Sequence, residues 1–159
     1  SARCGYIAAR PDWISALIDL QVATNFGGPS PMAAELLRVV LADGGYHKHV
    51  AALQGRLARA RRQAASRLAA LGITPWLEPR GGFYLWCRLP EGLDAADVAR
   101  AALKRGIVLA PGNAFSAAQT QTGLMRFNVS QMGGSEVDAV LRESLAEARE
   151  IAERRWQAS

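Results

Sequence analysis

The spacing of apolar residues changes at Gly72, from a long run of helical spacing to short strand-like segments, and this change constrains the fold more than any other feature. Before Gly72, apolar side chains recur every three or four residues, which is typical of helices with one buried face. This pattern predicts helices over residues 11–24, 31–42 and 46–71. After Gly72, short apolar segments bounded by Gly and Pro are typical of strands. We expect strands at residues 74–77, 82–89, 107–110 and 124–129, with an earlier one at 4–9.

Local signals predict where several of these elements begin and end. Ser30 and Asp94 are expected to cap helices, and Gly72 stands at the C-cap of the longest one. Ser135, with Asp138 three residues later, resembles a capping box for the final helix. The predicted fold class is therefore α/β (α+β), with a sheet of three to five strands, helices packed on it, and long helices before it.

One charged side chain interrupts the predicted strand at residues 124–129. Arg126 stands in its middle, among Leu124, Phe127 and Val129. Because arginine is seldom fully buried unless it is paired, this position predicts an anion nearby. The planar guanidinium can bind a carboxylate or a phosphate through two parallel hydrogen bonds. The residues alone leave two interpretations equally open, an ion pair with a core-facing Asp or Glu and a site for a ligand carboxylate.

Other candidate sites have weaker patterns. His47 and His49 lie two residues apart on a predicted helix and therefore point in different directions. A helical pair of metal ligands would instead be four residues apart, so no metal site is predicted. No Ser-His-Asp triad can be identified from sequence, since a triad is defined by its geometry. The arginines of the 46–71 helix lack a nucleic-acid-reading motif, and a solvated helix face is the favoured interpretation.

Composition limits the class of protein and its compartment. A chain of 159 residues, half of them hydrophobic, suits one compact domain. No apolar run reaches the length of a membrane span, and no secretory signal opens the chain. Cys4 and Cys87 both lie in apolar segments, so a reducing cytoplasm is expected. The net charge of +5 arises from an arginine-rich composition and is not by itself a nucleic-acid signal.

Four segments, in order, resemble the C-terminal half of a fold-type I pyridoxal-phosphate aminotransferase. They are Ser-Ala-Arg-Cys-Gly-Tyr-Ile-Ala-Ala at 1–9, Pro-Arg-Gly-Gly-Phe-Tyr-Leu-Trp at 79–86, Ala-Pro-Gly-Asn-Ala-Phe at 110–115 and Met-Arg-Phe-Asn-Val-Ser at 125–130. Within that family, the chain is most similar to the aminotransferase-like domains of MocR regulators, a branch of the GntR transcription factors. This finer resemblance rests on residues 43–49, the arginine-rich helix after them, and residues 86–90.

The resemblance implies roles for particular residues. Arg126 matches the arginine that binds the α-carboxylate of a substrate or effector, and Arg3 matches an arginine that contacts the cofactor phosphate. The loop that begins at Pro111 and Gly112 resembles the small-domain segment that closes toward the active site. Residues 25–30 resemble a loop near the partner subunit's cofactor, and residues 81–82 are expected to form a tight turn.

The resemblance also implies that the chain is part of a longer protein. Residues 1–159 would form its aminotransferase-like C-terminal domain, with 1–45 as remnant and hinge helices of a large domain and 46–159 as the small domain. The lysine that forms the Schiff base would lie upstream of Ser1, so no catalytic residue is assigned. Pyridoxal phosphate is expected in the full-length protein and is not expected to bind stably to this fragment.

Two functions follow from the resemblance. The first is an effector-sensing domain of a GntR/MocR-type transcriptional regulator. Its parent would be a cytoplasmic homodimer that binds an amino-acid-like effector, and it would contact DNA only through a separate N-terminal domain. The second is a stand-alone pyridoxal-phosphate aminotransferase that passes an amino group from an amino acid to a 2-oxo acid.

Overall fold

A computed structural model describes residues 5–25, 28 and 30–158. The chain divides into two compact units, residues 1–51 and residues 52–159. Within the described ranges, no helix is both long enough and apolar enough to cross a bilayer.

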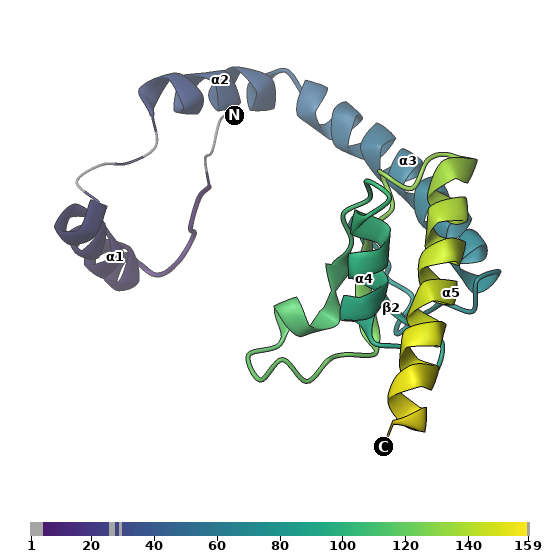
Figure 1. Cartoon of the computed structure of the whole chain (residues 1–159). Helices are drawn as coiled ribbons and strands as arrows, with labels where there is room; N and C mark the ends of the chain where they lie inside the picture. The colour runs from purple at the N-terminus through teal and green to yellow at the C-terminus, as the bar shows by residue number, and fades with distance from the viewer. Residues whose placement is uncertain (1–4, 26–27, 29, 159) are drawn as a thin grey trace. The chain divides into compact units, whose positions relative to one another are not determined.

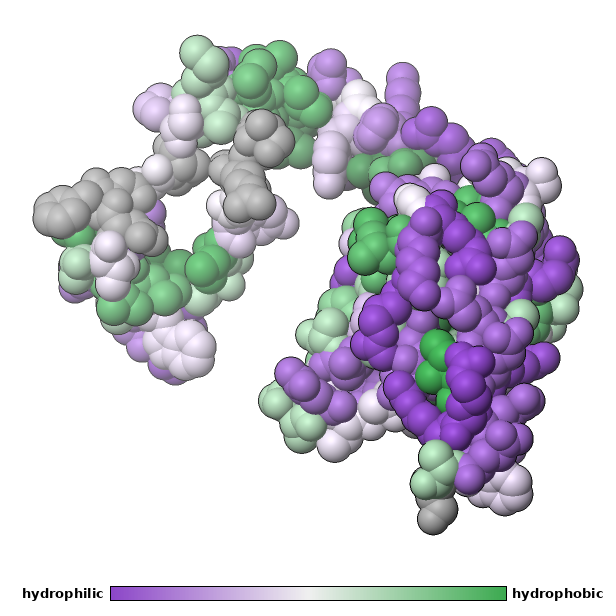
Figure 2. Space-filling view, in the orientation of Figure 1, coloured by the Kyte–Doolittle hydropathy of each residue, from purple (hydrophilic) through white to green (hydrophobic). Residues whose placement is uncertain are grey.

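The first unit is helical. It contains α1 (Pro11–Asn25), α2 (Pro31–Ala42) and the first residues of α3 (Gly45–Ala69). The helices form where apolar spacing predicts them, yet large apolar side chains stay exposed on both, and Figure 2 shows hydrophobic surface over each of them. Ser30 occupies the N-cap of α2 as predicted, although its side chain makes no capping hydrogen bond.

The strand predicted at residues 4–9 is wrong for its described part. Residues 5–10 have no regular secondary structure and are exposed. A strand needs a neighbour with which to exchange backbone hydrogen bonds, and the described residues place none beside this segment. Apolar composition alone therefore overstated the tendency to form a strand.

The end of α3 is set by Gly72, as the sequence predicts. Gly72 has a φ of +76°, in the left-handed region that glycine adopts without strain. Its N–H bonds to the carbonyl of Ala69, and the N–H of Ile73 bonds back to the carbonyl of Leu68. Leu68 and Ile73 are fully buried on either side of this turn. The turn thus ends the helix and returns the chain to the core.

The second unit contains a four-stranded antiparallel sheet in the order β1-β2-β4-β3, built from described residues. The strands are β1 (Thr74–Pro75), β2 (Tyr84–Arg88), β3 (Ala110–Pro111) and β4 (Leu124–Asn128). The longest pairing joins β2 to β4 over five residues, from Tyr84 opposite Asn128 to Arg88 opposite Leu124. The predicted α+β class, with a sheet of three to five strands, is confirmed.

The observed bounds of β2 and β4 lie within one or two residues of the prediction, whereas β1 and β3 are both shorter than predicted. β1 stops at Pro75 instead of residue 77, and β3 begins at Ala110 instead of residue 107. The shift of β3 has a local cause, because the N–H of Ile107 bonds to the carbonyl of Ala102 and so belongs to the end of the preceding helix. Only residues 110–111 come into register with β4.

One face of the sheet carries the core. Leu85, Cys87, Met125 and Phe127 alternate onto this face and are buried. The helices α4 (Ala95–Leu103) and α5 (Ser135–Gln157) contact each other along their lengths and share this core (Figure 1). Asp94 caps α4 as predicted, since its side chain accepts a hydrogen bond from the N–H of Ala96 at 2.7 Å.

The capping box predicted at the start of α5 does not form. The N-cap position is occupied by Gly134, without a side-chain capping bond. Asp138 instead accepts a hydrogen bond from Arg67 Nε of α3 at 2.7 Å. Arg67 also donates to the carbonyls of Met132 and Gly134, so one guanidinium ties α3 to the turn before α5. A tertiary ion pair has replaced the local cap.

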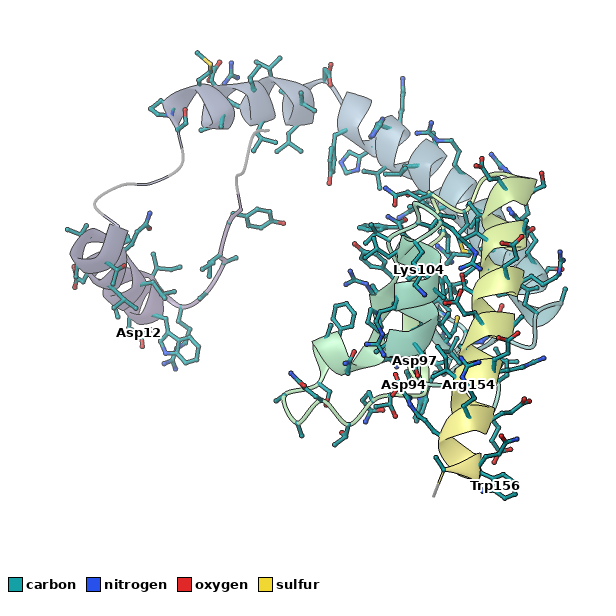
Figure 3. All side chains as sticks on the ribbon, viewed as in Figure 1. Asp12, Asp94, Asp97, Lys104, Arg154 and Trp156 are labelled. Carbon is teal, nitrogen blue, oxygen red and sulfur yellow. The ribbon has the colours of Figure 1, made fainter. Side chains whose placement is uncertain are left out.

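A buried carboxylate joins α4 to the far end of α5. Asp97 is 3% exposed and accepts hydrogen bonds from Arg100 on its own helix and from Arg155, whose Nη1 lies 2.6 Å from Oδ2. Figure 3 labels Asp97 near the start of α4. Burial by itself raises the pKa of Asp97, but the hydrogen bonds and charges of Arg100 and Arg155 outweigh it, so that the pKa is lowered.

Replacing this carboxylate should give a pH-dependent loss of stability. A group whose pKa is lowered on folding stabilises the protein above its unfolded pKa, and this contribution is lost as the pH falls through the folded pKa. We expect Asp97→Asn to lower the free energy of unfolding by about 1 kcal/mol at pH 7, allowing for the exposure of both arginines. Urea unfolding should show that the difference in free energy of unfolding between wild type and Asp97→Asn is smaller at pH 3 than at pH 7. Glu150→Gln, at an exposed pair, serves as control. An equal difference in free energy of unfolding at both pH values would contradict the prediction.

Candidate functional site

Arg126 lies on the sheet face opposite the core. In the register of β2 and β4 it stands across from Trp86, and on its other side it pairs with Ala110 of β3. Because side chains alternate along a strand, the core-facing neighbours of Arg126 are Met125 and Phe127, while Arg126 itself points the other way. The alternation therefore lets an apolar strand carry a guanidinium without burying it in the core.

Aromatic rings hold this guanidinium. The Cζ atom of Arg126 lies 4.1 Å from the ring centroid of Tyr84 and 4.3 Å from that of Phe115. Phe115 in turn meets Trp86 edge-on, with ring centroids 5.7 Å apart. A cation over an aromatic face is attracted by the ring's quadrupole, and stacking restricts the rotamers of a long side chain. These contacts fix Arg126 in place without neutralising its charge.

No carboxylate among the described residues pairs with Arg126. Its Nε is buried and has no hydrogen-bond partner there. A buried polar donor left without a partner costs about 1–3 kcal/mol, so this atom is strained in its present environment. The ion-pair interpretation left open by the sequence has no partner in the part of the chain that the structure describes. The site is cationic, and within the described ranges Nε of Arg126 has no acceptor.

The segment after β3 supplies one of the two rings. It forms a short 3-10 helix, η1 (Gly112–Phe115). A Cβ atom at Gly112 would lie 2.4 Å from the carbonyl oxygen of Gln121 and 2.7 Å from that of Leu124. Only glycine therefore allows the segment to approach so closely. The Oδ1 atom of Asn113 is a second buried polar atom without a partner among described residues.

A groove borders the guanidinium beside the short strand β3. Its polar lining comes from Tyr84, Arg126, Asn128 and Gln131. The rest of the lining is mostly apolar and consists of residues 106–110, Phe127, Met132, Val137 and Leu141. Because β3 is only two residues long, the rest of β4 has no strand partner on that edge. A small anion in this groove would meet one cation, two amide side chains, and aromatic and aliphatic surface. The arrangement can bind and orient a carboxylate.

The other predicted site residues have different outcomes. Arg3 lies outside the described residues, as do residues 26, 27 and 29 of the 25–30 loop. His47 and His49 belong to no metal-binding cluster, since no group of three His, Cys, Asp or Glu side chains gathers among the residues described. Gly82 has a φ of +78°, which fits the tight turn expected at residues 81–82.

The surroundings of Cys87 and Lys104 indicate structural roles for both side chains. Burial of Cys87 in the core raises the pKa of its thiol to about 12, so the thiolate is scarce at neutral pH. Lys104 on α4 forms an ion pair with Glu147 of α5 at 2.6 Å. Neither side chain is presented to the groove at Arg126.

Sequence reasoning missed Tyr84 and Phe115 as parts of the site. Both residues stand inside the segments that resemble aminotransferases, but segment similarity did not assign them a partner. The signal that could have found Tyr84 is the β2–β4 register, which places it one step along the same face from Trp86. Nothing local could have found Phe115, because its contact depends on how the loop after β3 folds back.

Solved structures that share this fold include aminotransferases. The multiple-substrate aminotransferase of Thermococcus profundus superposes with a TM-score of 0.74 over 92% of this chain and 36% of its own, at 21% sequence identity. At that identity the likeness establishes the fold alone. The family model described as "Aminotransferase class I and II" matches residues 1–143.

The chain belongs to the aminotransferase class I and II family, as the four sequence segments predicted. Its relatives include a regulator and an enzyme. The HTH-type transcriptional regulator YdcR of Escherichia coli is 30% identical over 148 residues, covering 87% of this chain and 31% of the regulator. Aromatic-amino-acid aminotransferase 1 of Thermococcus litoralis is 31% identical over 137 residues, covering 79% of this chain and 30% of the enzyme. The chain thus spans about a third of each relative.

The close fit of Gly112 gives a test of how the site is supported. We expect Gly112→Ala to lower the free energy of unfolding by about 1–3 kcal/mol, since the new methyl group meets two backbone oxygens that cannot rotate away. Gly123→Ala is the matched control, because a Cβ there meets nothing within 4 Å. Urea denaturation measures both variants, and equal midpoints would show that the loop relaxes freely around Gly112.

Proposed function

We propose that this chain is the C-terminal part of the effector-sensing, aminotransferase-like domain of a GntR/MocR-type transcriptional regulator, and that Arg126 binds the carboxylate of an amino-acid-like effector. The observation that carries the proposal is the guanidinium of Arg126, held by two rings, with a buried Nε that has no partner among the described residues. It is a prepared site for an anion.

A carboxylate fits this site better than other anions. The rings of Tyr84 and Phe115 both lie close to Cζ of Arg126, and the N–H groups of a guanidinium lie in its plane, where a planar anion can meet two of them at once. A carboxylate is planar and can accept two parallel N–H bonds from such a fork. Asn128 lines the same groove and could complete the recognition through its amide.

The regulator is favoured by one relative together with local sequence features. YdcR, whose name describes an HTH-type transcriptional regulator, matches 87% of this chain. Residues 43–49 and 86–90 resemble the MocR branch in particular. In such a regulator, an effector that binds one domain arrangement more tightly than another shifts the population between them, and this shift would reach DNA through an N-terminal domain. The parent is proposed to act as a homodimer.

The second candidate is a stand-alone aminotransferase. It is favoured by the similarity to the Thermococcus litoralis enzyme and by the aminotransferase structures that share the fold. In either candidate, Arg126 would orient the ligand by its carboxylate. The two candidates differ in whether chemistry follows binding, and the full-length sequence separates them, since a winged-helix segment far upstream of Ser1 would identify the regulator.

The described residues do not fit pyridoxal phosphate as a covalent cofactor. That attachment needs a lysine amine, and the sequence contains only Lys48 and Lys104. Lys104 is engaged by Glu147, and Lys48 lies within α3, in a sequence context unlike that of the family's lysine. We propose that other parts of the full-length protein hold the cofactor, with Arg3 contributing to its phosphate. No step is assigned to the cofactor in this chain.

Removing the guanidinium should weaken ligand binding without releasing the cofactor. In the full-length protein we expect Arg126→Ala to reduce amino-acid affinity by about 10- to 100-fold, because a charge-assisted hydrogen-bond pair is lost. Calorimetry measures the affinity, and cofactor absorbance measures retention.

The matched control is Arg88→Ala. Arg88 also stacks on an aromatic ring, 4.0 Å from the centroid of Trp76, and lines a different groove. If amino-acid affinity is unchanged in Arg126→Ala, or falls equally in Arg88→Ala, Arg126 has a structural role only.

A second prediction concerns the 159-residue chain alone. Pyridoxal phosphate added to it should form no more covalent adduct at Lys48 or Lys104 than it forms at an exposed lysine. A denatured sample of the same chain gives this reference amount. Borohydride reduction followed by peptide mass spectrometry measures the adduct at each site. A stoichiometric adduct at either lysine, resistant to dialysis, would contradict the proposal that the cofactor is held elsewhere.

A further inference from the structure

The exposed side of α3 carries positive charge without any acidic residue. Between residues 52 and 69 the helix contains Arg56, Arg59, Arg61, Arg62 and Arg67 and neither Asp nor Glu. Leu57, Ala60, Ala64 and Leu68 face the core. Arg56, Arg59 and Arg62 are exposed, and they recur every three residues along the outer side. We call these three residues, with Arg80, the basic row.

The basic row lacks the counter-ions that other arginines of this unit possess. Arg67 pairs with Asp138, and Arg105 pairs with Glu143 and Glu147. No hydrogen bond or ion pair joins Arg56, Arg59, Arg62 or Arg80 to an acidic side chain within the described ranges. Helix α5, by contrast, mixes acids and arginines along its hydrophilic face (Figure 2). The positive charge of α3 is therefore not balanced locally.

Arg61 connects the loop of Arg80 to the helix. Its Nη1 donates to the carbonyl of Gly82 at 2.8 Å, and its Nη2 lies 3.4 Å from the carbonyl of Arg80. A groove runs between this loop and α3, lined by Arg61, Arg62 and Arg80 among others, with Glu78 as its one carboxylate. These hydrogen bonds hold Arg61 beside the basic row. Because the groove lining contains three arginines and one glutamate, its net charge is positive.

We propose that the basic row binds the phosphate backbone of a nucleic-acid duplex without reading its sequence. Three residues of helix rise about 4.5 Å, so Arg56, Arg59 and Arg62 form a line of charge of about 9 Å along the axis. A duplex carries a dense line of negative charge, and arginines that neutralise phosphates release its counterions. None of the residues of the basic row lines the groove at Arg126. This proposal therefore does not depend on the function proposed for Arg126.

The surroundings of the row argue against other polyanionic partners. Residues 52–69 contain no aromatic side chain on which unpaired bases could stack. Apart from Leu53, the large apolar side chains of residues 52–69 face the core, so this stretch of the helix has little to insert into a lipid bilayer.

Fluorescence anisotropy with a labelled 30-base-pair duplex of random sequence tests the proposal on the 159-residue chain. We expect a Kd between about 10⁻⁴ and 10⁻⁶ M at physiological salt, weakening as salt rises from 50 to 200 mM. The triple variant Arg56→Glu, Arg59→Glu, Arg62→Glu should bind at least about tenfold more weakly. The slope of log K against log salt should fall in magnitude by about 2–3, since each phosphate contact contributes about 0.9.

The matched control reverses charges elsewhere on the same chain. Arg142→Glu with Arg149→Glu changes two exposed arginines of α5, and it should leave both the Kd and the salt slope near wild type. Circular dichroism checks that each variant folds, and Arg→Gln at the same three positions of α3 replaces the Glu variant if that one unfolds. Equal binding by the α3 and α5 variants would overturn the proposal. So would equal competition by poly-L-glutamate at matched charge, which would show a surface for any polyanion.

Discussion

The pairing of β2 with β4 is the constraint on which the second unit depends. Five residues of each strand stay in register, and a shift by one residue would exchange the two faces of both strands. In the observed register, Leu85, Cys87, Met125 and Phe127 enter the core below α4 and α5. The same register places Arg126 opposite Trp86 on the other face. Core and candidate site are therefore two results of one alignment.

The site depends on contacts between segments distant in sequence. Tyr84 comes from β2, Arg126 from β4 and Phe115 from η1, and the rings restrain the guanidinium while leaving its charge unpaired among the described residues. Gly112 makes the contact between Phe115 and Arg126 possible, because it lets η1 approach β4 closely. A buried donor without a partner costs free energy, and this cost is the physical basis for the ligand proposed at Arg126.

Charge is distributed unevenly around this unit. Ion pairs at Asp97, Glu147 and Asp138 join the helices α3, α4 and α5 to one another. The arginines of the basic row take no part in these pairs. Stability therefore depends on some arginines and leaves others available. In a regulator of the proposed kind, a small-molecule site and a polyanion-binding surface would lie on the same compact unit, with different residues responsible for each.

The sequence by itself determined the features that rest on local interactions. Helical spacing placed α1 to α5, Gly72 ended α3 because only a left-handed turn fits there, and Asp94 capped α4 through its own neighbour's N–H. Four sequence motifs also indicated the family and made Arg126 the candidate carboxylate-binding residue. Tertiary structure alone decided the rest, because those outcomes depend on partners far along the chain. It replaced the capping box at Asp138 with an ion pair to Arg67, restricted β3 to the two residues in register with β4, and brought Tyr84 and Phe115 to Arg126.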